Sequence, residues 1–442
     1  MIVCARAIIR SSVVALVAAS MCSAPARAAS ELKENPDPVL REVEAAVRQG
    51  DLDRALAIVG EAIRKKPAAS YHLERASLLV VKGDRTAAGE DFNAAVALDP
   101  EFTEARMQRG LFLADLGDAD AALADFDRAI ALDPKRVSPF LARGSTYLGV
   151  GRIDAAIADF ATALRLDPQD PEAWTRRASA QLARRDWDAA IADCTVALKL
   201  HPKKIAALNH RGGAWLGRQE PRKALADFEA VLAIEPHNAV ALIYRAQIRR
   251  LRGDLFHALE DASEAIRSDA HNPAAYNERA SIRAALGDVA AAIGDCTTAL
   301  LVGGPNEQTL LLRAMLSMQR ADYARARADF DQLLGGDSGL AGVARVHLAW
   351  LLATCPDDTV RDGARASRLA HEATARATAP DPVALDALAA ACAELGDFAG
   401  ALVVAHKAIA ATAPNLTKDL ATRRERVALY IDGQRFRLPA AK

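Results

Sequence analysis

The sequence is poor in aromatic residues and carries almost no net charge. Phe, Trp and Tyr together make up 5% of the 442 residues, whereas hydrophobic residues of all kinds make up 51%, and the formal net charge is −1. Ala, Leu, Arg, Asp and Glu dominate instead, which is typical of helices that pack closely on small side chains. A nearly neutral chain lacks the basic surface that attracts nucleic acid, so no nucleic-acid partner is expected.

Sequence motifs of catalysis and of metal binding are also missing. The chain has no nucleotide-binding loop, no Cys or His pairs with zinc spacing, no two-histidine metalloprotease helix and no Gly-x-Ser-x-Gly turn. Its nine histidines are scattered, and none is placed beside a nucleophile and an orienting acid. We therefore expect a protein that is not an enzyme and has no cofactor and no metal.

The N-terminal segment contains an apolar stretch, and no later segment offers a membrane span. Arg6 and Arg10 precede residues 11–19, and small residues on either side of Arg27 form the pattern that signal peptidase recognises. The stretch is too short to cross about 30 Å of hydrocarbon. We predict a signal peptide over residues 1–28 with cleavage after Ala28, a periplasmic or secreted protein, and no transmembrane segment in the mature chain.

The six cysteines leave two questions open. Cys22 ends the apolar stretch and makes a lipoprotein the less favoured alternative, since methionine precedes it where a small residue is expected. Cys194 and Cys296 lie three repeats apart, too far for a disulfide, and are expected in the core. Cys355 and Cys392 are expected on neighbouring helices, and the spacing neither requires nor forbids a bridge between them.

A tetrad similar to "ALDP" recurs every 34 residues. It ends at Pro100, Pro134, Pro168, Pro202 and Pro236, and counting on or back in the same phase gives eleven units. These units are expected to end near Pro67, Pro100, Pro134, Pro168, Pro202, Pro236, Ala270, Gly304, Ser338, Ala379 and Pro414. Each unit reads as a helix, a Gly-Asp type turn, a second helix and a stop.

The positions within each unit are equally regular. Small residues such as Gly110, Gly144 and Ala178 on the first helix match Ala122, Ala156 and Ala190 on the second, and Phe126, Phe160 and Phe228 recur one helical turn later, with Cys194 and Cys296 in place of phenylalanine. With its 34-residue period, this pattern resembles the tetratricopeptide repeat family. The resemblance implies an all-α fold, a right-handed superhelical solenoid of about ten to eleven hairpins, and a protein that binds protein or peptide partners.

The chain departs from the usual pattern of the family in one regular way. An arginine stands before the small residue of the first helix, and an aspartate follows sixteen residues later in eight successive units. The pairs are Arg75 and Asp91, Arg109 and Asp125, Arg143 and Asp159, Arg177 and Asp193, Arg211 and Asp227, Arg245 and Asp261, Arg279 and Asp295, and Arg313 and Asp329. The favoured interpretation is a structural ladder of bidentate ion pairs, and the alternative is an anion-binding stripe of arginines.

The resemblance also implies a concave groove lined by the first helices. From the phase of the repeat we expect its surface to be formed by Met107, Leu111, Leu141, Ser145, Thr175, Ser179, Asn209, Gly213, Ile243, Gln247, Asn277 and Ser281. Family members that clamp a partner's terminal carboxylate have lysines at such positions, and this chain has none there. Asn209 and Asn277 are the candidates for hydrogen bonds to the backbone of an extended peptide.

The repeats become irregular after residue 338. We divide the mature chain into a solenoid (residues 29–338), divergent C-terminal hairpins (339–414), and a capping helix with a basic tail (415–442). The segments "LAWLLATCPD" and "LDALAAACAELGDF" resemble a C-terminal module that recurs in bacterial tetratricopeptide proteins. The basic residues of the tail are expected on a solvated face, with docking on anionic lipid or cell-wall polymer as the alternative. They are Lys418, Arg423, Arg424, Arg426, Arg435, Arg437 and Lys442.

Three functional hypotheses follow. The first is a scaffold or adaptor of the cell envelope that binds partner proteins or peptides in the groove. The second is a structural component of an exopolysaccharide export or secretion machine. The third is an enzyme of a type without a recognised motif. The sequence does not indicate the identity of the partner or the oligomeric state.

Overall fold

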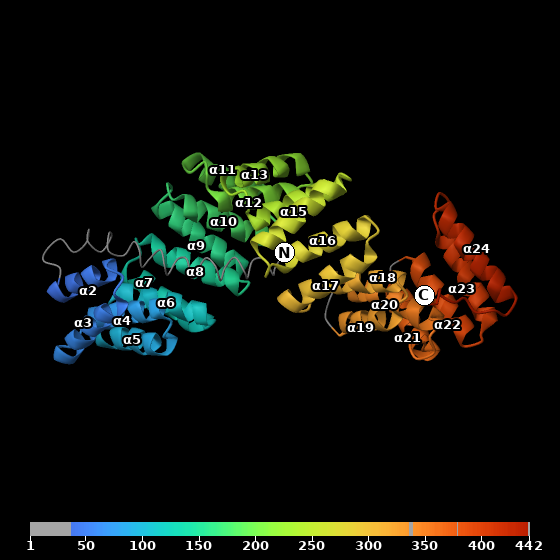
Figure 1. The fold of residues 1–442 in the computed structure, drawn as a ribbon, viewed down its shortest axis with the longest axis horizontal. Coiled ribbons are helices and arrows are strands. Elements are labelled where there is room, and N and C mark those ends of the chain that lie inside the picture. Colours follow the sequence, from blue (N-terminus) through green and yellow to red (C-terminus); the bar gives the residue numbers. More distant parts are fainter. Residues whose placement is uncertain (1–36, 336–338, 378, 441–442) are drawn as a thin grey trace. The chain divides into compact units, whose positions relative to one another are not determined.

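The computed structural model describes residues 37–335, 339–377 and 379–440, so the predicted signal peptide and Cys22 lie outside the described residues. These described residues form 23 helices and no strand, which confirms the all-α solenoid prediction. The chain divides into two compact units at residues 234 and 235. In each unit the helices follow one another as hairpins in chain order (Figure 1).

The first unit contains six described hairpins. Their helices are α2 (Pro38–Arg48), α3 (Leu52–Lys65), α4 (Ala69–Lys82), α5 (Arg85–Leu98), α6 (Thr103–Leu116), α7 (Ala119–Leu132), α8 (Val137–Gly149), α9 (Ile153–Leu166), α10 (Pro171–Arg184), α11 (Trp187–Leu200), α12 (Ile205–Gly217) and α13 (Pro221–Ile234). Even-numbered helices are the first helices of their hairpins, and odd-numbered helices are the second helices.

The second unit contains five described hairpins and a final helix. Its helices are α14 (Ala239–Leu251), α15 (Leu255–Ser268), α16 (Pro273–Ala285), α17 (Val289–Gly303), α18 (Glu307–Gln319), α19 (Tyr323–Leu334), α20 (Ala341–Thr354), α21 (Gly363–Arg376), α22 (Pro382–Glu394), α23 (Phe398–Ala411) and α24 (Thr417–Ile431). Helix α24 is a first helix without a second helix after it in the described chain.

The turn inside a hairpin is built from a glycine and an aspartate. Gly117 has φ of +89°, a conformation that glycine adopts without cost, and the N–H of Asp118 donates to the carbonyl of Leu113 at 2.9 Å. The Asp118 carboxylate then accepts the N–H of Ala121, which caps the second helix. Three described turns lack this glycine and place Arg185, Gln219 or Ala321 at positive φ, at a cost of about 1–2 kcal/mol each.

The two helices of a hairpin are matched in the size of their side chains. Phe126, Phe160 and Phe228 are fully buried, and each lies against a glycine of its own first helix. A Cβ atom added to Gly144 would be 2.8 Å from Cε1 of Phe160, closer than carbon atoms pack. Where a cysteine replaces the phenylalanine, as at Cys194, the opposing residue is alanine, here Ala178.

Candidate protein-interaction surface

The eight arginine and aspartate pairs are joined inside their own hairpins. In every pair the arginine Nε donates to Oδ2 at 2.6–3.0 Å and Nη2 donates to Oδ1 at 2.7–2.8 Å. The aspartate side chains are only 3–8% exposed and the arginines 16–32%. Each carboxylate is therefore desolvated and neutralised by a bidentate partner.

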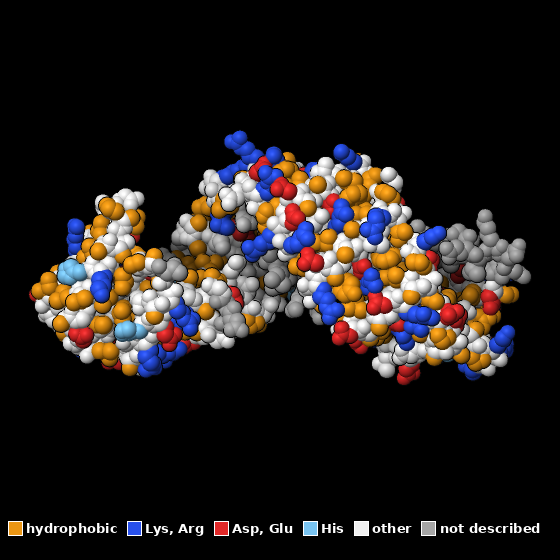
Figure 2. All heavy atoms as spheres, turned by 180° about the vertical axis from the view of Figure 1, so that it is seen from behind, with side chains coloured by type: hydrophobic (Ala, Val, Ile, Leu, Met, Phe, Trp, Pro, Cys, Tyr) orange, Lys and Arg blue, Asp and Glu red, His pale blue; other side chains and the backbone are white. Residues whose placement is uncertain are grey.

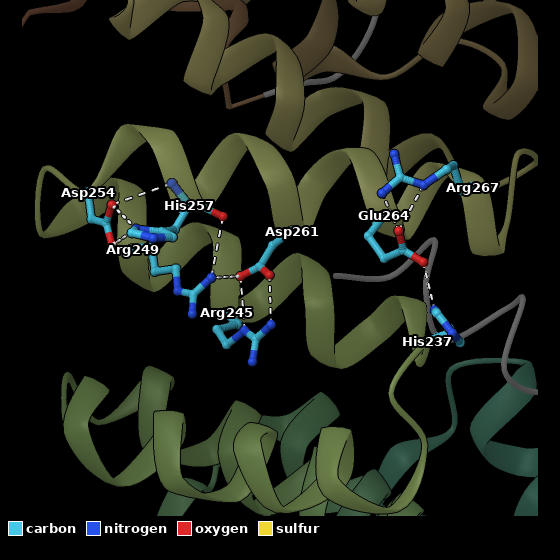
Figure 3. Close-up of polar contacts among 8 residues, drawn as sticks. All are labelled: His237, Arg245, Arg249, Asp254, His257, Asp261, Glu264 and Arg267. Atoms are coloured by element: carbon cyan, nitrogen blue, oxygen red, sulfur yellow. Dashed lines mark hydrogen bonds and ion pairs between the residues drawn. The ribbon is translucent and has the colours of Figure 1, made fainter.

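Several of these carboxylates have a second cationic partner. Asp261 accepts from Arg245 and also from Nη1 of Arg249 at 2.8 Å, as Figure 3 shows. Asp295 has the same arrangement with Arg283 at 2.7 Å. The arginine of one hairpin can also contact the previous hairpin, since Arg143 donates to Asp127 at 2.6 Å. The guanidinium groups are thus committed to carboxylates, which favours the structural interpretation of the ladder over an anion-binding stripe.

Polar contacts also fix the ends of helix α15. The Asp254 carboxylate accepts from the backbone N–H of His257 and lies 2.8 Å from its ring Nδ1 (Figure 3). At the other end Glu264 contacts both His237, at 2.6 Å, and Arg267. These histidines are local partners of carboxylates at the two ends of the helix.

The predicted groove residues do not all reach the surface. Met107, Leu111 and Thr175 are buried, with exposed fractions of 4%, 8% and 3%, so these three side chains offer a partner little surface. The other nine are half-buried: Leu141, Ser145, Ser179, Asn209, Gly213, Ile243, Gln247, Asn277 and Ser281. In α6 and α10 the side chains at the Met107 and Thr175 position point into the hairpin stack, and the neighbours Gln108 and Arg176 are the less buried residues.

We define the first-helix face by the positions of Glu104, Gln108, Leu111 and Asp115 and their equivalents in later repeats. These positions are spaced by four, three and four residues, so they lie on one side of a helix. Six of the predicted groove residues lie at the Leu111 position of this face, and the other six lie at the Met107 position, directly before the Gln108 position.

Successive first helices are joined across this face by polar contacts. Ser77 Oγ donates to Gln108 Oε1 at 2.9 Å, and Arg176 Nη1 donates to Ser145 Oγ at 2.7 Å. Further contacts join Glu104 to Arg136, Glu172 to Lys204, Arg250 to Glu278, and Asn277 to Thr309. Sequence reasoning missed them, although acid and base residues 32 positions apart, as in Glu172 and Lys204, are a signal that could have found them.

On the first-helix face, α10 and α12 carry a cluster of charged side chains. Glu172 accepts from Arg176 Nε at 2.8 Å and from Lys204 Nζ at 2.7 Å. Burial alone would raise the pKa of Glu172, but these two cations lower it below its usual value. The Glu172 carboxylate is therefore ionised, and each of its oxygens accepts a hydrogen bond from a cation of the same cluster.

Asn209 and His210, on α12, each have a polar atom without a hydrogen-bond partner among the described residues. Both Oδ1 of Asn209 and Nδ1 of His210 are buried from solvent. Burial lowers the pKa of His210 below 6.5, against the influence of Glu172 and of a hydrogen bond to the backbone of Thr175. A buried polar atom without a partner is costly in a folded protein, so these two atoms mark a place where a partner's polar groups are favoured.

No charge of one sign dominates the surface that Figure 2 shows. Lys and Arg side chains are interspersed with Asp and Glu over both units in that view. Within the part of the chain that the structure describes, no group of three or more His, Cys, Asp and Glu side chains is placed to hold a metal ion. Among those same residues, no helix is long and apolar enough to span a bilayer.

Four of the seven basic residues predicted on a solvated face of the tail are instead paired with carboxylates, whereas Lys418 and Arg424 are exposed. Arg423 and Arg426 of α24 both contact Asp386 of α22, at 2.9 Å and 3.2 Å. Arg435 and Arg437 contact Glu394, at 3.6 Å and 2.6 Å, so four of the predicted free cations are internal partners. The carboxylates that pair with these arginines lie about 40 residues earlier in the chain, so the charges of the tail segment alone do not predict the pairing.

The four described cysteines are free thiols. Cys194 and Cys296 are fully buried, and burial raises the pKa of each to about 12, so both stay protonated. Cys355 is also buried, and no disulfide joins it to Cys392.

Comparison with known proteins agrees with this repeat architecture. Residues 40–101, 73–137 and 141–205 match the family described as Tetratricopeptide repeat. No curated protein matches the chain. Among solved structures, a tetratricopeptide repeat protein from Parabacteroides merdae is 21% identical, with a TM-score of 0.50 over 57% of this chain and 98% of its own.

Two further solved structures are similar at lower TM-scores. Yeast Tom70 is 14% identical and covers 89% of this chain and 95% of its own, with a TM-score of 0.40. YrrB, described as a TPR protein with an unusual peptide-binding site, is 20% identical over 42% of this chain and 96% of its own, with a TM-score of 0.35. The match to the tetratricopeptide repeat family covers residues 40–137 and 141–205, and the described hairpins that follow them continue the same helical repeat.

Proposed function

We propose that this protein is a non-enzymatic scaffold of the cell envelope that binds a partner protein or peptide on its first-helix face. Tetratricopeptide repeat proteins generally mediate protein or peptide interactions, and YrrB is described as having a peptide-binding site. The predicted signal peptide over residues 1–28 supports export, with the mature chain beginning after Ala28.

One observation carries the assignment to this face. His210 lies at the Gln108 position of the face and Asn209 lies directly before it, and among the described residues Asn209 Oδ1 and His210 Nδ1 have no hydrogen-bond partner, whereas Glu172 beside them is already neutralised. Once the Asn209 and His210 side chains turn outward, a partner that supplies hydrogen-bonding groups of its peptide backbone would satisfy both atoms, and it would need no strong charge of its own. The proposed partner segment is therefore extended and rich in small or uncharged side chains.

A site-specific photocrosslinker tests this assignment. Ala206 is exposed on the first-helix face of α12, in the repeat position of Glu172, and Ala158 is exposed on second helix α9. Both are helical alanines, so a photoreactive residue at either position disturbs the fold little. We expect crosslinks to a defined protein from position 206 and none from position 158.

The contrary result is equally clear. Equal crosslinking from both positions, or crosslinks from position 158 alone, would contradict binding on the first-helix face. Export is tested separately by fractionation and N-terminal sequencing of the mature protein. A protein that keeps residues 1–28 and stays in the cytoplasmic fraction contradicts the envelope assignment without affecting the crosslinking result.

A further inference from the structure

The C-terminal strap, residues 434–440, crosses the ends of several helices in the second unit. After α24 the chain turns at Gly433, which has φ of +67°, and continues without regular secondary structure. It passes the C-terminal end of α22 and then that of α20, and it ends at the beginning of α19. In a solenoid most hairpins contact only their neighbours, so a segment that reaches back over three hairpins is exceptional.

Backbone groups at the helix ends bind the strap. The N–H of Leu438 donates to the carbonyl of Thr354 at 2.9 Å, and the hydroxyl of Tyr323 donates to the carbonyl of Pro439 at 2.5 Å. Arg437 donates to the carbonyl of Ala353 at 3.2 Å. The last carbonyls of a helix have no partner in their own helix and attract cations, so these helix ends form a ready acceptor surface.

Glu394 gives this surface its charge. Its side chain is 15% exposed, and it contacts Arg437 at 2.6 Å and Arg435 at 3.6 Å from the strap. Arg361 holds the same carboxylate from the loop before α21, at 3.0 Å. One half-enclosed acid is therefore positioned to recognise two arginines that are separated by a single residue.

Two apolar side chains of the strap fill matching places. The centroid of the Phe436 ring lies 5.4 Å from the centroid of the Trp350 ring. Phe436 also packs against the hydrophobic cluster that contains Val427 and Tyr430 of α24. Leu438 packs against the core cluster around α20. Glu394 thus contacts both arginines of the strap, Trp350 contacts the aromatic ring, and the core cluster around α20 contacts the leucine.

We propose that the C-terminal ends of α20 and α22 form a docking site for an extended segment of another protein chain with the pattern arginine–aromatic–arginine–leucine. The chain's own residues 435–438 occupy this site in cis. The site lies in the second unit and is separate from the first-helix face. It uses side-chain recognition of a short linear sequence, and the strap itself shows which sequence fits.

The way in which the strap is attached allows a competing peptide to displace it. Residues 431–435 are exposed, and among the described contacts the strap backbone is held after Gln434 by Leu438 and Pro439. Since the strap is tethered beside its site, its effective concentration there is high, and a free peptide must compete with it. Weakening the strap in the full chain should therefore open the site.

The test uses the full-length chain and a fluorescent peptide of residues 433–440. We compare the wild-type chain with the Phe436→Ala, Arg437→Ala double variant, and follow binding by fluorescence anisotropy. We expect the double variant to bind the peptide at least tenfold more tightly than the wild-type chain. A peptide with both arginines replaced by alanine should bind the double variant at least tenfold more weakly.

A matched pair of acid variants tests the role of Glu394. Added to the double variant, Glu394→Gln should lower the affinity for the peptide about tenfold, whereas Glu372→Gln, which removes a partner of Arg345 on α20, should leave it unchanged. A folded double variant that fails to bind, binding equal to that of the wild type, or equal effects of the two acid variants would overturn the proposal.

Two further measurements keep the test decisive. If thermal melting shows that the double variant is unfolded, Arg435→Ala, which alters an exposed residue of the strap, replaces it with the same expected direction. Sedimentation over a range of concentrations identifies a second copy as the occupant. A wild-type dimer that disappears in the double variant supports docking of the strap in trans.

Discussion

The matching of glycine with phenylalanine predicts that the two positions are energetically coupled. The hairpin of α8 and α9 has Gly144 against Phe160, and the next hairpin has Ala178 against Cys194. We therefore consider Gly144→Ala, Phe160→Cys and the double variant, which gives the hairpin of α8 and α9 the alanine and cysteine pair of the hairpin of α10 and α11. The reverse exchange, Ala178→Gly with Cys194→Phe, is the matched control.

The magnitudes follow from the geometry. Alanine at position 144 places its Cβ 2.8 Å from Phe160, which costs about 1–3 kcal/mol of overpacking and is partly offset by a gain of about 1 kcal/mol in helix propensity. Phe160→Cys alone removes most of a fully buried ring and should cost about 2–4 kcal/mol. In the double variant the overpacking is relieved, so the coupling should be about 1–3 kcal/mol and favourable.

Hydrogen exchange is the appropriate assay, because a repeat array need not unfold in a single step. Protection factors of α8 and α9 give the local free energy of opening, and those of α18 and α19 serve as an internal reference. In the control, Cys194→Phe should be destabilising alone and restored by Ala178→Gly. Additive effects within about 0.5 kcal/mol in both exchanges would refute the packing argument.

Three other predictions concern the ladder and the buried titratable groups. Arg177→Ala leaves the buried Asp193 carboxylate unpaired and should cost about 3–5 kcal/mol in denaturant unfolding, whereas Arg245→Ala should cost less because Arg249 still contacts Asp261; equal losses would contradict this. Burial lowers the pKa of His210, so the unfolded chain takes up a proton first as the pH falls. The melting temperature of the wild type should drop from about pH 6.5 down to the folded-state pKa, and His210→Gln should flatten that drop; parallel curves would show that His210 is not the cause. Cys194 and Cys296 should resist alkylation at pH 8 until denaturant is added, while labelling of either in the folded chain would contradict their raised pKa.

The parts of the fold that depend on local, repeated signals could be predicted from the sequence. The 34-residue phase located the hairpins, and the arginine and aspartate spacing anticipated contacts that the structure shows in all eight pairs. Both depend on residues within one repeat. In such cases the helical period alone determines which side chains meet.

The parts that depend on contacts between distant repeats could not be predicted in the same way. Met107 and Thr175 were placed on the surface because a one-residue rotation of the first helix cannot be resolved from its apolar pattern alone. The partners of Arg423 and Arg437 lie on α22, about 40 residues earlier in the chain. Arg185 occupies a left-handed turn position without the glycine that normally marks it, because the surrounding hairpin determines its conformation.

The location of both ion-pair partners within one repeat has a consequence for how such a chain can change its length. When recombination or design removes or duplicates one whole copy, the acid and the base leave or arrive together, so no buried carboxylate loses its bidentate arginine. The helix cap and the matched glycine or alanine travel in the same segment. Insertion or deletion of a complete copy should therefore be tolerated far better than a change of a few residues inside one.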